Sequence, residues 1–164
     1  MPYKGSYVWK LRKKIGHELL LVPGVAIVVT NAKDQILFVK RSDTASWGLP
    51  AGIAETDSSF LSCALAELQE ETGIKTDGAN LIPFGTLSDP NLHRVTYPNG
   101  DQTHGFTLCF WLKDYNEPIP ASGDENTAIR FSELRVLEGQ IFPPTKHMLK
   151  LFEAYQQTGQ FQLS

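Results

Sequence analysis

The stretch LPAGIAETDSSFLSCALAELQEETGI, residues 49–74, decides the fold, because it places a glycine-containing loop directly before an acidic helix. The Asp and Ser residues at 57–59 are candidate N-caps, since their side chains can accept hydrogen bonds from the first free N–H groups of a helix. The helical pattern continues to Thr72, and Gly73 then provides a C-terminal stop. We therefore expect a helix that ends at Thr72.

Three glutamates of this helix, Glu67, Glu70 and Glu71, share one edge, because each helical residue advances by about 100°. A neighbouring arc carries leucines that can face the core: Leu61, Leu65 and Leu68. Each pair of carboxylates at this spacing destabilises the helix by about 0.2–0.5 kcal/mol, unless a cation such as Mg²⁺ offsets the repulsion. Taken by themselves, the three glutamates fit a solvated acidic helix face better than a metal site.

The surrounding sequence changes this interpretation, because residues 52–74 resemble the Nudix box. In that motif a Gly is followed after five residues by Glu, and after seven more by Arg-Glu-aliphatic-x-Glu-Glu-x-Gly-aliphatic. The alignment needs no gap, and the matching residues are Gly52, Glu67, Leu68, Glu70, Glu71, Gly73 and Ile74. Two positions depart from the pattern: Ser58 stands at the first Glu and Ala66 at the Arg.

In the family, the two side chains replaced by Ser58 and Ala66 are understood as a salt bridge that braces the loop against the helix. Loss of both avoids a lone, partly buried charge, which costs more than loss of the pair. We interpret the departure as a structural substitution. The alternative is a degenerate Nudix domain that binds a nucleotide ligand as a sensor or interaction module without turnover.

The resemblance implies Mg²⁺- or Mn²⁺-dependent hydrolysis of a pyrophosphate bond in a nucleoside diphosphate linked to another moiety. Candidate substrates are ADP-ribose-like compounds, nucleotide sugars and nucleoside triphosphates. It implies that Glu67, Glu70 and Glu71 are the catalytic residues and metal ligands, with Glu67 as a further ligand or general base. Backbone groups at Gly52 would complete the metal site.

Three residues outside the helix are candidates for substrate binding. Arg41 follows a predicted strand, where the family commonly carries an Arg near the substrate's phosphates, although a solvated surface charge is equally compatible. Trp47 can stack on a base or pack within its loop. Glu125, preferred over Asp124, is the candidate acidic residue from outside the box, with an ordinary polar turn as the alternative.

The remaining sequence predicts an α/β/α sandwich of the α+β type, with a mixed sheet flanked by helices. The β-branched run at 25–29 is typical of a strand buried on both faces, and we expect it to form a hairpin with 36–40. The Asn99-Gly100 pair predicts a tight hairpin turn with positive φ at both residues. Further strands are expected at 81–87, 92–97, 103–112 and 128–131, and helices at 5–15 and after Pro143, with 42–56 as a long loop.

Composition is that of an ordinary globular protein, with 41% hydrophobic and 20% charged residues in 164, so we expect one domain over 1–164. The net charge of −3 gives no indication of a nucleic-acid or membrane partner, and a small nucleotide-type substrate is what the Nudix resemblance implies. The basic stretch at 10–14 is expected to be a solvated helix face, and Cys63 and Cys109 to be buried. We also expect a cytoplasmic location, and the Nudix resemblance is compatible with a homodimer.

Overall fold

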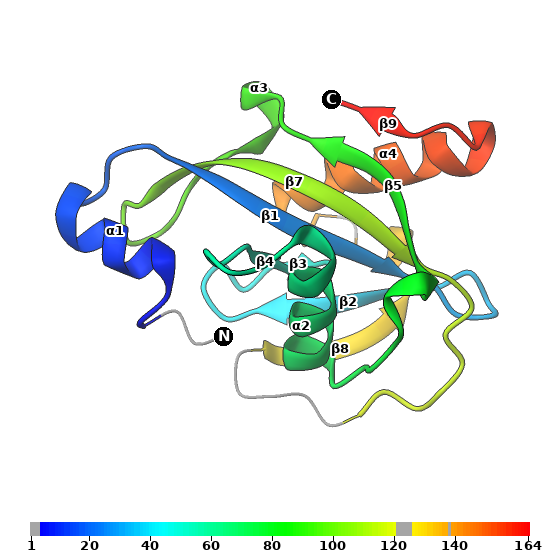
Figure 1. The fold of residues 1–164 in the computed structure, drawn as a ribbon. Helices are drawn as coiled ribbons and strands as arrows, with labels where there is room; N and C mark the ends of the chain where they lie inside the picture. Colours follow the sequence, from blue (N-terminus) through cyan, green and yellow to red (C-terminus); the bar gives the residue numbers. More distant parts are fainter. Residues whose placement is uncertain (1–3, 121–125, 138) are drawn as a thin grey trace.

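The computed structural model describes residues 4–120, 126–137 and 139–164 of the chain. The strands are β1 Leu20–Val29, β2 Ile36–Arg41, β3 Trp47–Gly48, β4 Ala51–Ile53, β5 Leu81–Leu87, β6 Arg94–Thr96, β7 Gln102–Leu112, β8 Asn126–Ser132 and β9 Gln162–Leu163. They form a six-stranded mixed sheet of order β4-β1-β7-β5-β9, with β6 paired to β7, and a three-stranded sheet of order β3-β2-β8 (Figure 1). The sequence did not predict the second sheet.

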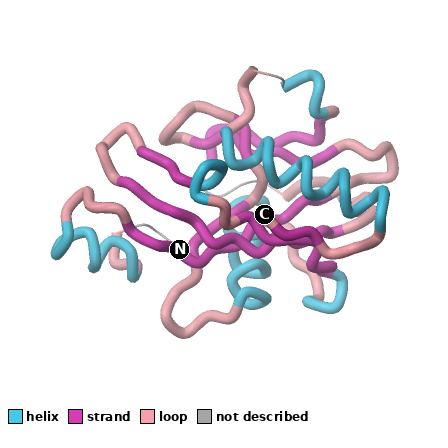
Figure 2. The backbone as a smooth tube through the Cα atoms, turned by 90° about the horizontal axis from the view of Figure 1, so that it is seen from above, coloured by secondary structure: helices cyan, strands magenta, loops and turns pink. Residues whose placement is uncertain are grey.

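The helices are α1 Tyr7–Ile15, α2 Phe60–Thr72, α3 Pro90–His93 and α4 Pro143–Thr158, with short 3₁₀ turns at Gly78–Asn80 and Leu134–Leu137. Helix α2 begins and ends as predicted: Ser59 is its N-cap and Gly73 takes the left-handed conformation at its C-terminus. Helix α4 lies across one face of the sheet (Figure 2). The prediction for Leu61 was wrong, since this side chain is 41% exposed.

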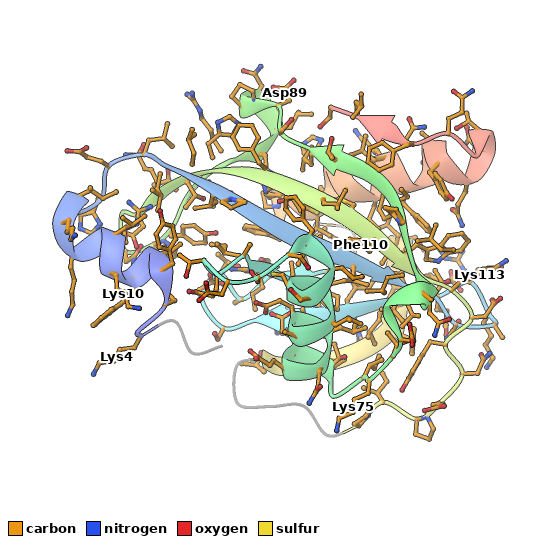
Figure 3. All side chains as sticks on the ribbon, in the orientation of Figure 1. Lys4, Lys10, Lys75, Asp89, Phe110 and Lys113 are labelled. Carbon is orange, nitrogen blue, oxygen red and sulfur yellow. The ribbon has the colours of Figure 1, made fainter. Side chains whose placement is uncertain are left out.

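Strand β1 lies at the centre of the molecule, and its side chains alternate between two core layers. Val25, Ile27 and Val29 pack with Phe110 and the buried residues of α2 (Figure 3). Ala26 and Val28 belong to the other layer, which includes the buried side chains of α4. The prediction of a strand buried on both faces, and of a mixed sheet flanked by helices, is thereby confirmed.

The predicted hairpin between 25–29 and 36–40 was wrong, because the two runs belong to different sheets. β1 pairs in parallel with β7 along its whole length and antiparallel with β4 at its other edge. With both edges occupied, β1 meets β2 through the isolated bridge between Thr30 and Ile36. The loop expected over 42–56 supplies the short strands β3 and β4.

The Asn-Gly hairpin forms between β6 and β7, where Thr96 is paired with Gln102. Its turn is longer than expected: the Tyr97 N–H donates to the Asp101 carbonyl at 2.9 Å, and φ is positive at Gly100 (89°) but not at Asn99. The extra residues in the turn relax the need for two positive φ angles. This turn lies beside α1.

Candidate active site

The acidic edge of α2 faces a cavity of about 950 Å³, which Glu67, Glu70 and Glu71 all line. The adjoining face of the helix is buried through Cys63, Ala64, Leu68 and Thr72. A capping box at the N-terminus fixes the helix start, because Ser59 and Ser62 each accept a hydrogen bond from the backbone N–H of the other. The helix is thus held by its apolar face, and the glutamates are turned toward the cavity.

Gly52 lies directly against the Glu67 side chain, so the first position of the box has a steric reason to be glycine. A Cβ placed on Gly52 would lie 2.0 Å from Glu67 Cδ and 2.1 Å from its Oε1. One residue earlier, the Ala51 N–H donates to Glu71 Oε2 at 2.9 Å. Strand β4 and helix α2 therefore meet through two of the glutamates.

Arg41 is the last residue of β2 and lines the same cavity. Its Nε and Nη2 donate to the two carboxylate oxygens of Asp43 at 3.0 and 2.7 Å. Burial opposes the charge of Arg41, but the hydrogen bond and charge of Asp43, with a contribution from Glu71, raise its pKa above the usual value. The Asp43 pair uses two of the five N–H groups of the guanidinium.

Trp47 is not among the residues that line this cavity, and its assignment as a substrate-binding residue stays a prediction. The side chain is 6% exposed and packs in the core layer with Leu49 and Phe38. Its ring lies under the Arg130 guanidinium at 4.7 Å. The short strand β3, to which Trp47 belongs, pairs antiparallel with β2. Glu125 and Asp124 lie outside the described residues.

The chemistry of the glutamate group fits a hard divalent cation, because carboxylate and backbone carbonyl oxygens are its preferred ligands. Gly52, with its open Cα, lets Glu67 approach the β4 backbone. Within the described part of the chain, no group of three or more His, Cys, Asp or Glu side chains converges as a preformed metal site. Mg²⁺ usually keeps water and substrate phosphate as its remaining ligands.

The two departures from the box are accommodated without an ion pair. Ser58 Oγ donates to the Glu55 carbonyl at 2.8 Å, which closes the loop ahead of α2 locally. Ala66 is exposed. The Glu55 carboxylate accepts the Tyr7 N–H at 2.9 Å and thereby links this loop to the start of α1.

Several cavity residues escaped sequence reasoning, because their positions depend on packing between distant segments. His93 lies over Gly105, where an added Cβ would lie 2.4 Å from its ring. Burial lowers the pKa of His93, so its neutral form prevails near pH 7. Arg12, expected on a solvated face, is 9% exposed and lines the cavity. No local pattern distinguishes Arg12 from its exposed basic neighbours.

Comparisons with known proteins agree with this geometry. The family description "NUDIX domain" matches residues 20–154. An RNA pyrophosphohydrolase of Ruthia magnifica subsp. Calyptogena magnifica is 38% identical over 75 residues, which are 46% of this chain and 40% of that protein. The match thus spans less than half of the relative's length.

Solved structures share the whole fold at low sequence identity. A bifunctional NMN adenylyltransferase/ADP ribose pyrophosphatase from Francisella tularensis, complexed with AMP and a manganese ion, has a TM-score of 0.67 at 16% identity, covering 88% of this chain and 44% of that one. An ADP-ribose pyrophosphatase from Streptococcus suis has a TM-score of 0.64 at 17% identity, covering 87% and 97%. With the box glutamates and Gly52 on one cavity and the family match over 20–154, the chain belongs to the Nudix family.

Proposed function

We propose that this chain hydrolyses a pyrophosphate bond in a nucleoside diphosphate linked to another moiety, with Mg²⁺ or Mn²⁺ as cofactor. The observation that carries the proposal is the shared cavity, which brings together the three box glutamates, Gly52 and Arg41. Acidic ligands and a guanidinium in one cavity suit a metal-bound pyrophosphate. Two similar proteins, an RNA pyrophosphohydrolase and an ADP-ribose pyrophosphatase, are named for cleavage of the same type of bond, which supports the proposal.

Each residue has a role that follows from its position. Glu67, Glu70 and Glu71 would hold the cation, with Glu67 as a further ligand or general base beside Gly52. When bound, the cation would lower the pKa of a water molecule and offset phosphate charge. Arg41 would use its remaining N–H groups to orient a phosphate, since Asp43 already fixes its plane.

A substrate panel tests this function. The panel contains ADP-ribose, nucleotide sugars, nucleoside triphosphates, dinucleoside polyphosphates and a 5′-triphosphorylated RNA, each with Mg²⁺, and phosphate-containing products are separated by chromatography. We expect turnover of at least one member, and its loss by about 100-fold or more in Glu70→Gln and Glu71→Gln. The Gln side chain retains an acceptor for the Ala51 N–H, so the fold of the Glu71 variant should persist.

The alternative is a Nudix domain that binds a nucleotide without turnover, and its motivation is the replacement of the brace by Ser58 and Ala66. Absence of product from every panel member, with folded protein and saturating Mg²⁺, would decide in its favour if calorimetry still detects nucleotide binding. Wild-type rates in both glutamine variants would overturn the site assignment. A homodimer and a cytoplasmic setting stay predictions. No helix in the described residues is long and apolar enough to cross a membrane.

A further inference from the structure

The segment that precedes the family match carries an uneven share of the charge. Residues 4–17 contain five of the 15 Lys and Arg residues of the chain and no Asp or Glu, although the net charge of the whole chain is −3. Four of these five residues belong to α1, and the family match begins at residue 20. Such a local excess of positive charge indicates a partner of the opposite charge.

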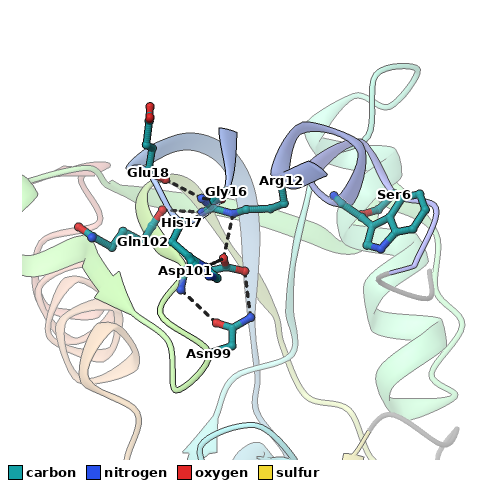
Figure 4. A network of polar contacts seen from close by, with 9 residues as sticks. Ser6, Arg12, Gly16, His17, Glu18, Asn99, Asp101 and Gln102 are labelled. Carbon is teal, nitrogen blue, oxygen red and sulfur yellow. Dashed lines mark hydrogen bonds and ion pairs between the residues drawn. The ribbon is translucent and has the colours of Figure 1, made fainter. Parts of the chain in front are cut away.

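Arg12 contributes little to the surface charge, because its guanidinium is used inside the molecule (Figure 4). Its Nη1 donates to the carbonyls of Gly16 and Glu18 at 3.1 and 2.5 Å, and its Nη2 to the carbonyl of Gln102 at 2.6 Å. Its Nε lies 3.6 Å from Asp101 Oδ1. The buried Arg12 therefore turns one side of α1 inward and leaves the lysines on the other side.

Three lysines project from the outer side of α1. Lys10, Lys13 and Lys14 span an arc of about 100°, because each helical residue advances by about 100°. All three are exposed, as is Lys4 ahead of the helix, and Figure 3 shows Lys4 and Lys10 pointing away from the sheet. Together these four residues form the lysine face. None of them forms an ion pair with another described residue, and the Lys13 ammonium lies 3.6 Å from the centroid of the Trp9 ring.

The helix dipole explains only part of this charge. Cations are favourable near the C-terminus of a helix, where Lys13 and Lys14 lie, and unfavourable near its N-terminus. Lys4, however, precedes the N-cap residue Ser6, and Lys10 lies in the middle of the helix. The lysine face as a whole is therefore not a device that stabilises α1.

Both ends of α1 are fixed, so the lysine face keeps its position relative to the cavity. Arg12 holds the C-terminal end through the carbonyl of Gln102. At the N-terminal end, the Glu55 carboxylate accepts the Tyr7 N–H at 2.9 and 3.2 Å. A polyanion that binds the lysines thus meets a rigid array of ammonium groups.

The position of α1 indicates which kind of polyanion fits. Its inner side lines the cavity through Ser6, Val8 and Arg12, and a helix with its side chains is about 10 Å across. A strand whose end enters the cavity can therefore continue over the lysine face. A bilayer does not fit in this way, because a helix that lies on a membrane buries its apolar side in lipid, whereas Val8 of α1 is buried in the protein.

We propose that the lysine face of α1 docks a single-stranded RNA whose 5′-terminal triphosphate occupies the cavity. This inference rests on the proposed function and names its substrate class, because such an RNA joins a pyrophosphate bond to a chain of phosphates in one molecule. Each backbone phosphate that a lysine neutralises releases condensed counterions, which makes the contact favourable and dependent on salt. The docking is independent of RNA sequence, since contacts to phosphates carry no sequence information.

Binding of an RNA that contains no pyrophosphate bond tests the docking surface without turnover. The probe is a 5′-monophosphorylated, 3′-fluorescein-labelled single-stranded RNA of about 12 nucleotides, within the usual site size of single-strand binding. Its anisotropy is measured with Mg²⁺ between about 50 and 200 mM KCl. We expect Lys10→Gln/Lys13→Gln/Lys14→Gln to weaken RNA binding about tenfold at low salt. The slope of log K against log salt should fall by about 2, because each phosphate contact of a single strand contributes about 0.7.

Steady-state kinetics connect the lysine face to the cavity. In the triple variant, KM for a 5′-triphosphorylated RNA should rise about tenfold, while KM for a nucleoside triphosphate should stay within about twofold of wild type. The matched control is Lys33→Gln/Lys75→Gln/Lys150→Gln, which removes three exposed lysines from other elements and should keep RNA affinity within about twofold. Thermal melts verify that both triple variants are folded.

Three results would overturn the inference while the hydrolase function stands: no RNA binding by the wild type, unchanged RNA affinity in the α1 variant, or an equal loss in the control variant. Lysine-dependent sedimentation with phosphatidylserine vesicles, without an effect on RNA, would assign the face to a membrane and likewise overturn it. If no member of the substrate panel is turned over, the proposed function fails, and the anisotropy measurement still decides whether the lysine face binds RNA.

Discussion

Gly52 shows how a single residue serves the site by lacking a side chain. The glycine pairs with Val25 in the sheet, while the space above its Cα is filled by Glu67. The requirement is steric, because the backbone and the carboxylate approach each other more closely than a Cβ allows. The position of Glu67, a predicted metal ligand, thus depends on the absence of a side chain at Gly52.

Gly52→Ala should therefore displace Glu67 and lower kcat by about 100-fold, the size expected for a misplacement of about 1 Å at a reacting centre. The chain should remain folded, because β4 keeps its pairing with β1. Steady-state kinetics and a thermal melt measure the two effects separately. Ala51→Gly, in the adjacent residue, is the control and should retain activity within a few-fold. Full activity in Gly52→Ala would contradict the assigned role of Glu67.

Asp101 gives a prediction for the pH dependence of stability. Burial opposes its ionisation, but hydrogen bonds from His17 and Asn99 and the charge of Arg12 lower its pKa below the usual value. A carboxylate with a lowered pKa in the folded state stabilises the protein above its unfolded pKa of about 3.9, and this contribution is lost as pH falls through the folded value.

Asp101→Asn should accordingly lower the melting temperature at pH 7, and the difference from wild type should narrow as the pH falls below about 4. Thermal melts between pH 7 and 3 measure this difference. Asp77→Asn, at an exposed 3₁₀ N-cap, controls for a general loss of charge. A difference that grows on acidification would show that Asp101 is not stabilised as its anion.

At the scale of elements, helix α2 keeps its position without the brace of the family. Burial of Cys63, Ala64 and Leu68 anchors one face, and the Ser59 capping box fixes the start. The loop ahead of the helix is closed by the Ser58 hydroxyl on the Glu55 carbonyl. Packing and local hydrogen bonds therefore substitute for a long-range ion pair.

Restoring the family pair tests this substitution. Ser58→Glu alone removes the hydroxyl donor to Glu55 and should destabilise by about 1 kcal/mol. The Ser58→Glu/Ala66→Arg double variant should recover at most about 1 kcal/mol of this loss, because exposed ion pairs contribute about 0–1 kcal/mol. A double-mutant cycle from urea unfolding gives the coupling. A gain of several kcal/mol in the free energy of unfolding, or a large rise in kcat, would show that the missing ion pair limits stability or activity.

At the scale of the whole molecule, the cavity is assembled from α1, β4, α2, the β6–β7 turn and the start of α4. A ligand that binds the folded state but not the unfolded state stabilises it by mass action. Mg²⁺ should therefore raise the melting temperature in a concentration-dependent way. At a Mg²⁺ concentration of 100 times Kd, the folded state should be stabilised by about 2.7 kcal/mol.

The Mg²⁺ shift should disappear in the Glu70→Gln/Glu71→Gln double variant, while K⁺ at matched ionic strength should not reproduce it. Differential scanning fluorimetry with EDTA-treated protein measures both. An equal shift in wild type and double variant would place the cation elsewhere on the molecule, and would leave the glutamates without their assigned role.

The sequence determined those features that depend on neighbouring residues. Helix α2 follows from caps and periodicity within 57–74, and the buried strand at 25–29 follows from its continuous β-branched run. The α1 and α4 helices follow from the same local rules. Helical spacing likewise places Glu67, Glu70 and Glu71 on one edge of α2, so the sequence alone identifies them as a group.

Tertiary structure alone decided which strands pair and what reaches the cavity. Strands β1 and β2 belong to two sheets: β1 pairs along its whole length with β7, some eighty residues away in the chain, and β4 pairs with Gly24, Val25 and Ala26 at the other edge. The burial of Trp47 likewise depends on tertiary packing, because its ring lies in a core cluster with Phe38 and Leu49. The Arg12 guanidinium donates to the nearby carbonyls of Gly16 and Glu18 and to the carbonyl of Gln102, which is 90 residues away in the chain. The long-range contact has no counterpart in local sequence, because a backbone carbonyl carries no side-chain signal.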